Sequence, residues 1–220
     1  MRQEIQITEN FSKISCRDYG KLFLTQGDTT FLAIEADQEI LSEIIAEVRG
    51  DTLVMGFDSD WFGGIGKVLK SMFDGTDRKV IYYLTVPDID KLSISGNINL
   101  ECDQFKSENL TIRVSGLGYL TFTQLECESL EVIISGRGEF TAAGRADHQS
   151  VRISGSGEYE APNLSSQSMR IVISGQGNAT VSVSDNLDIN ISGLGQVNYH
   201  GHPKLRQVIS GLGKSKRLND

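Results

Sequence analysis

The sequence is poor in the residues that mark several familiar protein classes. Its 220 residues include three prolines, one tryptophan and three cysteines. The cysteines, Cys16, Cys102 and Cys127, are odd in number and unrelated in spacing, so neither a disulfide framework nor a CxxC metal site is indicated. No uninterrupted apolar run approaches the ~18 residues that a membrane-spanning helix needs, so we expect no transmembrane segment.

Positive charge is also in short supply. The chain has 21 Lys and Arg against 29 Asp and Glu, a net charge of −8, and such a balance gives no overall attraction to nucleic acid. The opening MRQEIQITENF lacks the apolar core of a signal peptide. An exported precursor whose leader had been removed would begin in the same way, so we expect a cytoplasmic location if Met1 is the native start and an envelope or extracellular one otherwise.

Glycine is abundant, with 23 residues, and 13 of them belong to a repeat. A Ser-Gly pair recurs seven times at intervals of 20, 20, 19, 20, 18 and 18 residues, and six of the seven copies read S-G-x-G. A β-branched residue precedes every serine. The seven serines are Ser95, Ser115, Ser135, Ser154, Ser174, Ser192 and Ser210.

Apolar residues alternate with mostly polar ones on both sides of each motif, which is typical of half-buried strands. A unit of 18–20 residues cannot close a core alone, whereas stacked units bury their apolar positions as continuous ladders. The pattern predicts an all-β fold, a single-stranded right-handed parallel β-helix (β-solenoid) of about seven rungs. We expect the glycines to provide positive φ at a tight corner and close approach to the rung above, and the serine hydroxyls to bond to the corner backbone. A phosphate cradle is disfavoured, because a nucleotide loop is single and lies between a strand and a helix.

The first part of the chain is rich in predicted strands but has no repeat. We expect residues 1–89 to form an amino-terminal β region that continues into a solenoid over 90–220. The predicted strands cover residues 4–7, 13–16, 21–25, 30–36, 44–48, 53–57 and 80–86.

Residues 58–79 break this pattern with apolar residues at helical spacing, which predicts a short amphipathic helix. We expect it to cap the solenoid end, and the alternative is a helix that binds a partner or a membrane surface. Trp61 and Phe62 are the candidate contact residues of that alternative.

The sequence resembles the bacterial family of putative auto-transporter adhesins with a head GIN domain. The resemblance rests on FSKISCRDYGKLFLTQGDTTFLAIEAD, VRGDTLVM, YLTVPDIDKLSISG, the S-G-x-G run and VNYHGHPKLRQVISGLG, in which Tyr199, Gly201 and Pro203 form a Y-x-G-x-P element. It implies a β-helical fold, an envelope or secreted location and an adhesive role, with no assigned catalytic residue. The sequence as given differs from what the resemblance leads us to expect in two respects: it opens without a leader, and its 58–79 segment is longer and more helical.

No residue pattern indicates catalysis, a cofactor or a metal. Glu101 and Glu160 share their rung position with Thr and Asn residues and so belong to a solvated face. His200 and His202 form an HxH pair without the four ligands of a structural zinc site. We therefore expect a non-catalytic surface protein that binds an unknown protein or glycan partner through its solenoid faces, and that forms homo-oligomers through exposed ends. The alternatives are a β-helical polysaccharide lyase or hydrolase, and an intracellular structural scaffold.

Overall fold

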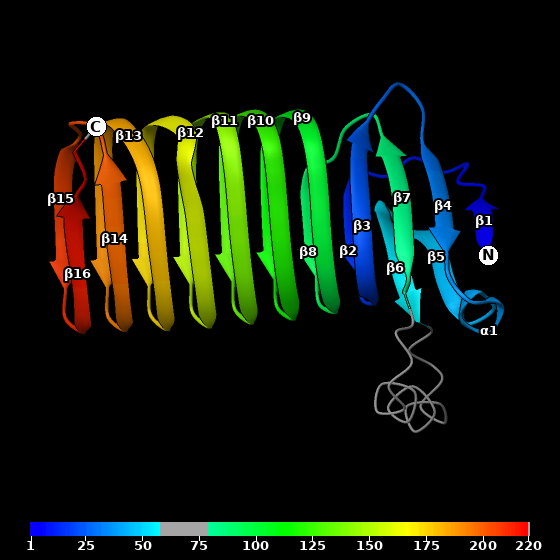
Figure 1. Ribbon diagram of the computed structural model, residues 1–220. Coiled ribbons are helices and arrows are strands. Elements are labelled where there is room, and N and C mark those ends of the chain that lie inside the picture. Colours follow the sequence, from blue (N-terminus) through cyan, green and yellow to red (C-terminus); the bar gives the residue numbers. More distant parts are fainter. Residues whose placement is uncertain (58–78, 220) are drawn as a thin grey trace.

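The computed structural model describes residues 1–57 and 79–219 and shows an all-β solenoid of about six turns, with 75% of the chain in strands (Figure 1). The elements are β1 (Arg2–Ile5), β2 (Lys13–Cys16), β3 (Tyr19–Gln26), β4 (Phe31–Glu35), α1 (Gln38–Leu41), β5 (Ile44–Arg49), β6 (Thr52–Phe57), β7 (Ile81–Val86), β8 (Lys91–Ile94), β9 (Asn97–Val114), β10 (Leu117–Ile134), β11 (Arg137–Ile153), β12 (Ser156–Ile173), β13 (Gln176–Ile191), β14 (Leu194–His200), β15 (Lys204–Ile209) and β16 (Leu212–Arg217).

Each central turn is one long strand that bends around the core, so that its two halves lie on different sides of the solenoid (Figure 1). The first half of β9 pairs with β3, and its second half pairs with β8. All strands belong to one 16-stranded sheet that wraps around the core. On one side of the solenoid the order is β1-β4-β7-β3-β9 and onward to β14-β16, and on another side it begins β5-β6-β2-β8 and ends at β15. Neighbouring turns are parallel from β9 to β14, as the repeat predicted.

The amino-terminal end departs from this parallel arrangement. Strand β4 pairs antiparallel with β1 and β7, and β5 pairs antiparallel with β6. The short helix α1 connects β4 to β5 and was not predicted. All seven predicted strands of this region are present, with β1 beginning two residues before the predicted one. The predicted helix at 58–79 lies almost entirely outside the described residues. Across the described part of the chain, no helix has the length and apolarity to cross a bilayer.

The residues before the serines form a buried ladder, which confirms the central expectation of the repeat. Val114 lies opposite Ile134, which lies opposite Ile153, and all three are at most 2% exposed. The ladder continues through Ile173 and Ile191. In the other direction it passes through Ile94, Cys16 and Met55, so β2 and β6 extend the same core. Each such side chain contributes about 1.5–3 kcal/mol by leaving water.

The glycines of the motif are needed for close approach, and the expectation of positive φ was wrong. A Cβ on Gly136 would lie 2.2 Å from the carbonyl oxygen of Gly116 in the turn before, and the same contact recurs from Gly116 to Gly211. Positive φ among the described glycines occurs at Gly20, Gly50, Gly56, Gly144 and Gly201, none of which belongs to an S-G-x-G motif. The reason is that the residues of each corner keep ordinary backbone dihedral angles, and the backbone of one corner packs directly on the backbone of the corner before it.

The serines bond to the preceding turn mainly through their backbone. The N–H of Ser135 donates to the Val114 carbonyl at 2.8 Å, and Ser154 and Ser174 repeat this bond at 2.9 Å. The hydroxyls of Ser95, Ser115 and Ser135 make only long hydrogen bonds of 3.4–3.5 Å, each to the carbonyl of the residue that precedes the corner of the turn before. The predicted hydroxyl ladder is therefore a weak supplement to a strong backbone one.

A further corner, absent from the repeat in the sequence, precedes the first motif. Cys16 pairs with Ile94 and Tyr19 with Asn97, so Arg17-Asp18-Tyr19-Gly20 occupies the place of an S-G-x-G motif. The Asn97 N–H donates to the Asp18 carbonyl at 2.8 Å. The Asp18 carboxylate is 3% exposed and accepts hydrogen bonds from the Tyr82 hydroxyl and from the Tyr19 N–H. Burial raises the pKa of Asp18 to about 6.

Candidate functional site

A hollow in the described part of the chain arises where two neighbouring strands separate. Strand β3 pairs with β9 from Tyr19 opposite Asn97 to Phe23 opposite Glu101, and then turns away. It stays paired with β7 as far as Gln26. The sheet therefore forks beyond Phe23, and the fork opens a groove of about 1260 Å³.

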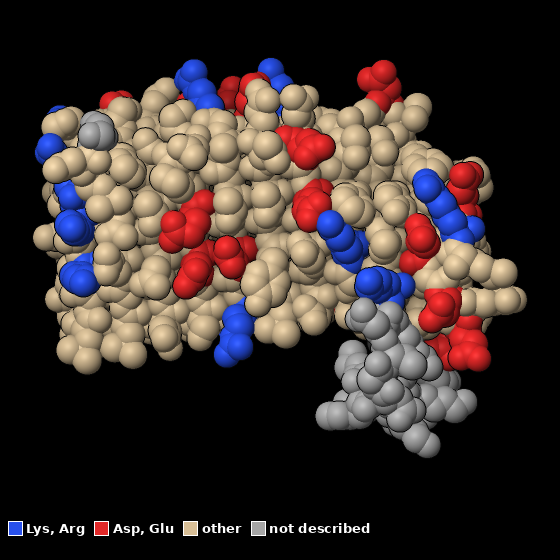
Figure 2. Space-filling view, viewed as in Figure 1, with Lys and Arg blue, Asp and Glu red and all other residues tan. Residues whose placement is uncertain are grey.

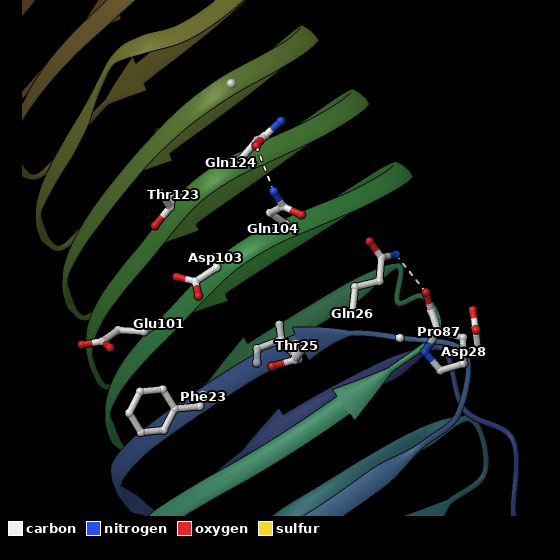
Figure 3. Close-up of a pocket in the computed structure, with 13 residues that line it drawn as sticks. Phe23, Thr25, Gln26, Asp28, Pro87, Glu101, Asp103, Gln104, Thr123 and Gln124 are labelled. Carbon is white, nitrogen blue, oxygen red and sulfur yellow. Dashed lines mark hydrogen bonds between the residues drawn. The ribbon is translucent and has the colours of Figure 1, made fainter.

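The groove is lined mainly by polar side chains from strands β3, β9 and β10 and from two loops (Figure 3). Strand β3 contributes Phe23, Thr25 and Gln26 on one side, β9 and β10 form the other side, and the loop residues Asp28 and Pro87 lie at the far end. The lining residues of β9 and β10 are Glu101, Asp103, Gln104, Thr123 and Gln124.

Gln26 closes the far end of the fork by replacing the missing strand pairing with its side-chain amide. Its Nε2 donates to the carbonyl oxygens of Pro87 and Lys106, both at 2.8 Å, and its Oε1 accepts from the Lys106 N–H at 2.8 Å. One side chain thus bonds to both branches of the fork. The width of the groove is consequently fixed at this end by hydrogen bonds rather than by loop conformation.

Two glutamines continue the polar surface along the solenoid axis. Gln104 lies opposite Gln124 in the register of β9 and β10, and its Nε2 donates to the Gln124 Oε1 at 3.2 Å. Both side chains are exposed. Each amide keeps further donor and acceptor capacity, so this pair can bond to a ligand that carries both donors and acceptors.

Aromatic rings and a cation hold the end of the groove at which the strands meet. Phe23 stacks on Tyr83 of β7 with ring centroids 5.4 Å apart. The Lys21 ammonium lies 4.4 Å from the Phe23 centroid and 2.7 Å from a Glu101 carboxylate oxygen. Because Tyr83 and Lys21 both contact its ring, Phe23 is held as an apolar wall with a defined position.

The groove is acidic. Asp28, Glu101 and Asp103 line it, and Lys21 is engaged by Glu101. Lys106 lies beyond the Gln26 bridge, where its ammonium is 3.7 Å from Glu126. The surplus of carboxylates disfavours an anionic ligand.

The two carboxylates considered from the sequence are too far apart to act together. The register connects Glu101 to Thr121, Thr121 to Thr141 and Thr141 to Glu160. Three steps of about 4.8 Å place the two strand positions about 14 Å apart, whereas paired glycosidase carboxylates are separated by roughly 5–9.5 Å. Burial, followed by the charges of Glu158 and Glu139, raises the pKa of Glu160, and Thr180 lowers it by hydrogen bonding.

The other residues considered from the sequence remain apart from the groove. His148 bonds to the Ser168 hydroxyl at 2.8 Å, and His200 and His202 lie at the end of β14 and just beyond it. The three cysteines are free and buried, and burial raises the pKa of Cys102 and Cys127 to about 12. No group of three His, Cys, Asp or Glu side chains within residues 1–57 and 79–219 is arranged to hold a metal. Trp61 and Phe62 lie outside the described residues.

Apart from Glu101, the residues named in the groove were not considered as site residues from the sequence. Gln26, Asp103 and Gln104 belong to no motif, and the groove depends on β3 pairing with two strands that are distant in the chain. One available signal was the loss of alternation at Asp103-Gln104 and again at Thr123-Gln124, where two exposed polar residues follow one another.

Comparisons with known proteins agree with this architecture. The family described as putative auto-transporter adhesin, head GIN domain matches residues 10–203. A putative adhesin from Bacteroides fragilis has 23% identity and a TM-score of 0.84 over 99% of this chain and 96% of its own. A putative lipid binding protein from Parabacteroides distasonis has 20% identity and a TM-score of 0.73, and a putative adhesin from Parabacteroides merdae has 21% and 0.72, each over 100% of this chain and 96% of its own.

These structural likenesses, at identities below 25%, show the fold. No curated protein matches the sequence. The family match covers most of the chain, including the corner at Asp18, the fork and six of the seven Ser-Gly motifs. It also agrees with the resemblance seen in the sequence. The chain belongs to the putative auto-transporter adhesin, head GIN domain family.

Proposed function

We propose that this protein is a non-catalytic, adhesin-like protein of the cell envelope or cell surface, and that it binds a neutral glycan in the groove between β3 and β9. The observation that carries the proposal is the groove itself, a polar hollow of about 1260 Å³ in a family named for adhesion. Membership of a family named as putative adhesins supports the existence of a binding partner. The polar lining of the groove supports a neutral glycan as that partner.

A glycan fits this chemistry because each hydroxyl both donates and accepts hydrogen bonds. The groove offers amides at Gln104 and Gln124, hydroxyls at Thr25 and Thr123, and an acceptor carboxylate at Asp103. The part of the Phe23 ring that Tyr83 and Lys21 leave uncovered adds an apolar contact for a sugar ring. The carboxylates favour neutral sugars over uronic acids or sulfated polymers.

Titration calorimetry with neutral and acidic oligosaccharides tests the proposal. We expect neutral sugars to bind and acidic ones to bind more weakly. Asp103→Ala and Gln104→Ala should each weaken binding about tenfold, since a lost hydrogen bond to a ligand costs ~1–2 kcal/mol.

Matched controls come from exposed residues far along the solenoid. Asp185→Ala and Gln167→Ala remove the same chemical groups from β13 and β12 and should leave binding unchanged. The absence of binding across the neutral panel, or equal loss in groove and control variants, would overturn the proposal.

The rival function is a β-helical enzyme that cleaves polysaccharides. It predicts product release from neutral or acidic polysaccharides, with or without calcium, and loss of turnover when a surface carboxylate is replaced. The spacing of Glu101 and Glu160 argues against that pair as its catalytic residues. An intracellular scaffold would bind none of the sugars.

A further inference from the structure

The two ends of the solenoid differ in charge. Residues 35–47 carry five acids and no Lys or Arg, whereas residues 200–219 carry five Lys and Arg and no acid. In Figure 2 Lys and Arg side chains predominate at the end formed by β15 and β16, whereas acidic side chains lie over the middle of the solenoid and at the opposite end, where some Lys and Arg side chains also lie. The acids are Glu35, Asp37, Glu39, Glu43 and Glu47, and the cations are Lys204, Arg206, Lys214, Lys216 and Arg217.

The charges at both ends are exposed and largely uncompensated. Within the described chain, none of the five carboxy-terminal cations forms an ion pair. At the amino-terminal end Arg49 pairs with Glu47 at 2.5 Å, and Arg2 lies opposite Glu35 in the register. The Met1 ammonium donates to the Ala36 carbonyl beside Asp37 at 2.6 Å, whereas Glu39 and Glu43 have no ion-pair partner among the described residues, so the end keeps a negative charge.

Both ends also present strands with an unpaired edge. Among the described strands, β16 pairs only with β14 and β15 only with β13, while β1 pairs only with β4 and β5 only with β6. β1 and β16 are the first and last strands on one side of the solenoid, and β5 and β15 are the first and last strands on another side. Exposed apolar side chains accompany the basic edge: Leu205 is 38%, Val208 53% and Leu212 84% exposed.

We infer that a second copy of this chain docks its acidic amino-terminal end onto the basic carboxy-terminal end, so that molecules associate head to tail. The charges select this orientation, because tail-to-tail contact would place five cations against five and head-to-head contact would oppose two acidic ends. In the head-to-tail arrangement β16 of one molecule meets β1 of the next, and β15 meets β5. Strand pairing then continues from one molecule to the next on both of these sides of the solenoid.

Such an interface is heterologous, so each molecule retains one free end of each kind. Association therefore continues into short filaments whose length rises with concentration. It also weakens with salt, because the Debye length falls from ~30 Å at about 0.01 M to ~3 Å at about 1 M. The groove plays no part in this interface, and its occupancy should leave association unchanged.

Sedimentation velocity over a range of concentrations at those two ionic strengths tests the inference. We expect the weight-average sedimentation coefficient of the wild-type chain to rise with concentration at low salt only. A chain that stays monomeric at low salt would overturn the inference.

A charge exchange between the ends makes the test specific. Lys214→Glu with Lys216→Glu makes the basic end less basic, and Glu39→Lys with Glu43→Lys reverses much of the acidic end. We expect each double variant alone to associate at least about tenfold more weakly than wild type, because like charges then face each other. An equal mixture of the two should regain association, because each altered end then finds its complement.

The control is Arg113→Glu with Arg152→Glu, which changes the charge equally at two exposed positions of β9 and β11 away from both ends. It should associate as wild type does. Association that survives both end variants would overturn the inference. So would a monomer whose basic end instead binds vesicles of phosphatidylcholine and phosphatidylserine and releases them on Lys214→Glu with Lys216→Glu, since the occupant would then be an anionic lipid surface.

Discussion

At the scale of single residues, the corner at Asp18 combines a structural role with a titratable group. Asp18 replaces the first glycine of the motif, and its buried carboxylate bonds to the Tyr82 hydroxyl. Its pKa is raised from 3.8 to about 6, with burial as the main cause and the Tyr82 bond acting in the opposite direction. Folding therefore favours the protonated form. The contribution of Asp18 to stability is fully present below about pH 4 and is lost as pH rises through about 6.

Tyr82→Phe should shift this pH dependence. Without the hydroxyl, the charged carboxylate loses a hydrogen bond, so the pKa of Asp18 rises further and the loss of stability moves above pH 6. Urea unfolding at a series of pH values measures the effect. Tyr83→Phe, the same change at the next residue, should leave the pH profile in place, and equal shifts in both variants would contradict the assignment.

Gly136→Ala tests the close approach at the repeated corner. The added methyl would lie 2.2 Å from a backbone oxygen that cannot rotate away, so we expect a loss of at least ~1–3 kcal/mol in the free energy of unfolding. Ser135→Ala in the same corner removes only a 3.5 Å hydrogen bond and should cost less than ~0.5 kcal/mol. Comparable losses from both changes would show that the backbone contact is relieved elsewhere.

At the scale of strands, the core is filled by ladders whose members differ in size. Phe140 stacks on Tyr159 with ring centroids 5.1 Å apart, and Phe122 from the neighbouring ladder is tilted against Phe140 at 5.8 Å. In that neighbouring ladder Phe122 lies opposite Ala142, and Ala142 and Ala161 lie two residues after Phe140 and Tyr159. Tyr159 also donates a buried hydrogen bond to Gln149 at 2.6 Å. Large side chains in one ladder are thus accompanied by small ones in the next, which keeps the thickness of the solenoid even.

Phe140→Ala should remove the centre of this stack. We expect a loss of ~3–5 kcal/mol, because the rings on both sides are fixed by their own strands and cannot collapse into the cavity. Thermal or urea unfolding measures it. Tyr119→Ala, at an aromatic residue that is 51% exposed on β10, is the control and should cost less than ~1 kcal/mol.

The repeat made the ladders predictable, and the absence of the repeat pattern explains why the Asp18 corner and the groove could not be predicted. Val114, Ile134 and Ile153 recur at fixed distances in the sequence, so their stacking followed from the period alone. The corner at Asp18 was missed because Arg17 and Asp18 replace the serine and glycine that define the motif. The groove was missed because its shape depends on Gln26 bonding to Lys106, a contact between residues 80 positions apart with no periodic signal.

At the scale of the whole molecule, each turn is a separable unit that contacts mainly its two neighbours. Deleting residues 135–153 removes one turn and places Ile134 directly before Ser154, with the ladders still in phase. We expect a folded protein of lower stability that is shorter by about 4.8 Å. Small-angle scattering and circular dichroism measure this outcome. Deleting only residues 135–144 would put the ladders out of phase and should abolish folding, and a folded product would contradict the modular interpretation.

The antiparallel strands at the amino-terminal end have a consequence for biosynthesis. The ribosome releases β1 to β7 first, and these strands already include the antiparallel pairs at the amino-terminal end of the solenoid. From β9 onward each new segment of 18–20 residues finds a completed edge in the turn made just before it. Loop closure is then short at every step, which favours rapid addition. The nascent chain can therefore fold vectorially, with its first part serving as the template and its last, basic turn emerging only when all the others are in place.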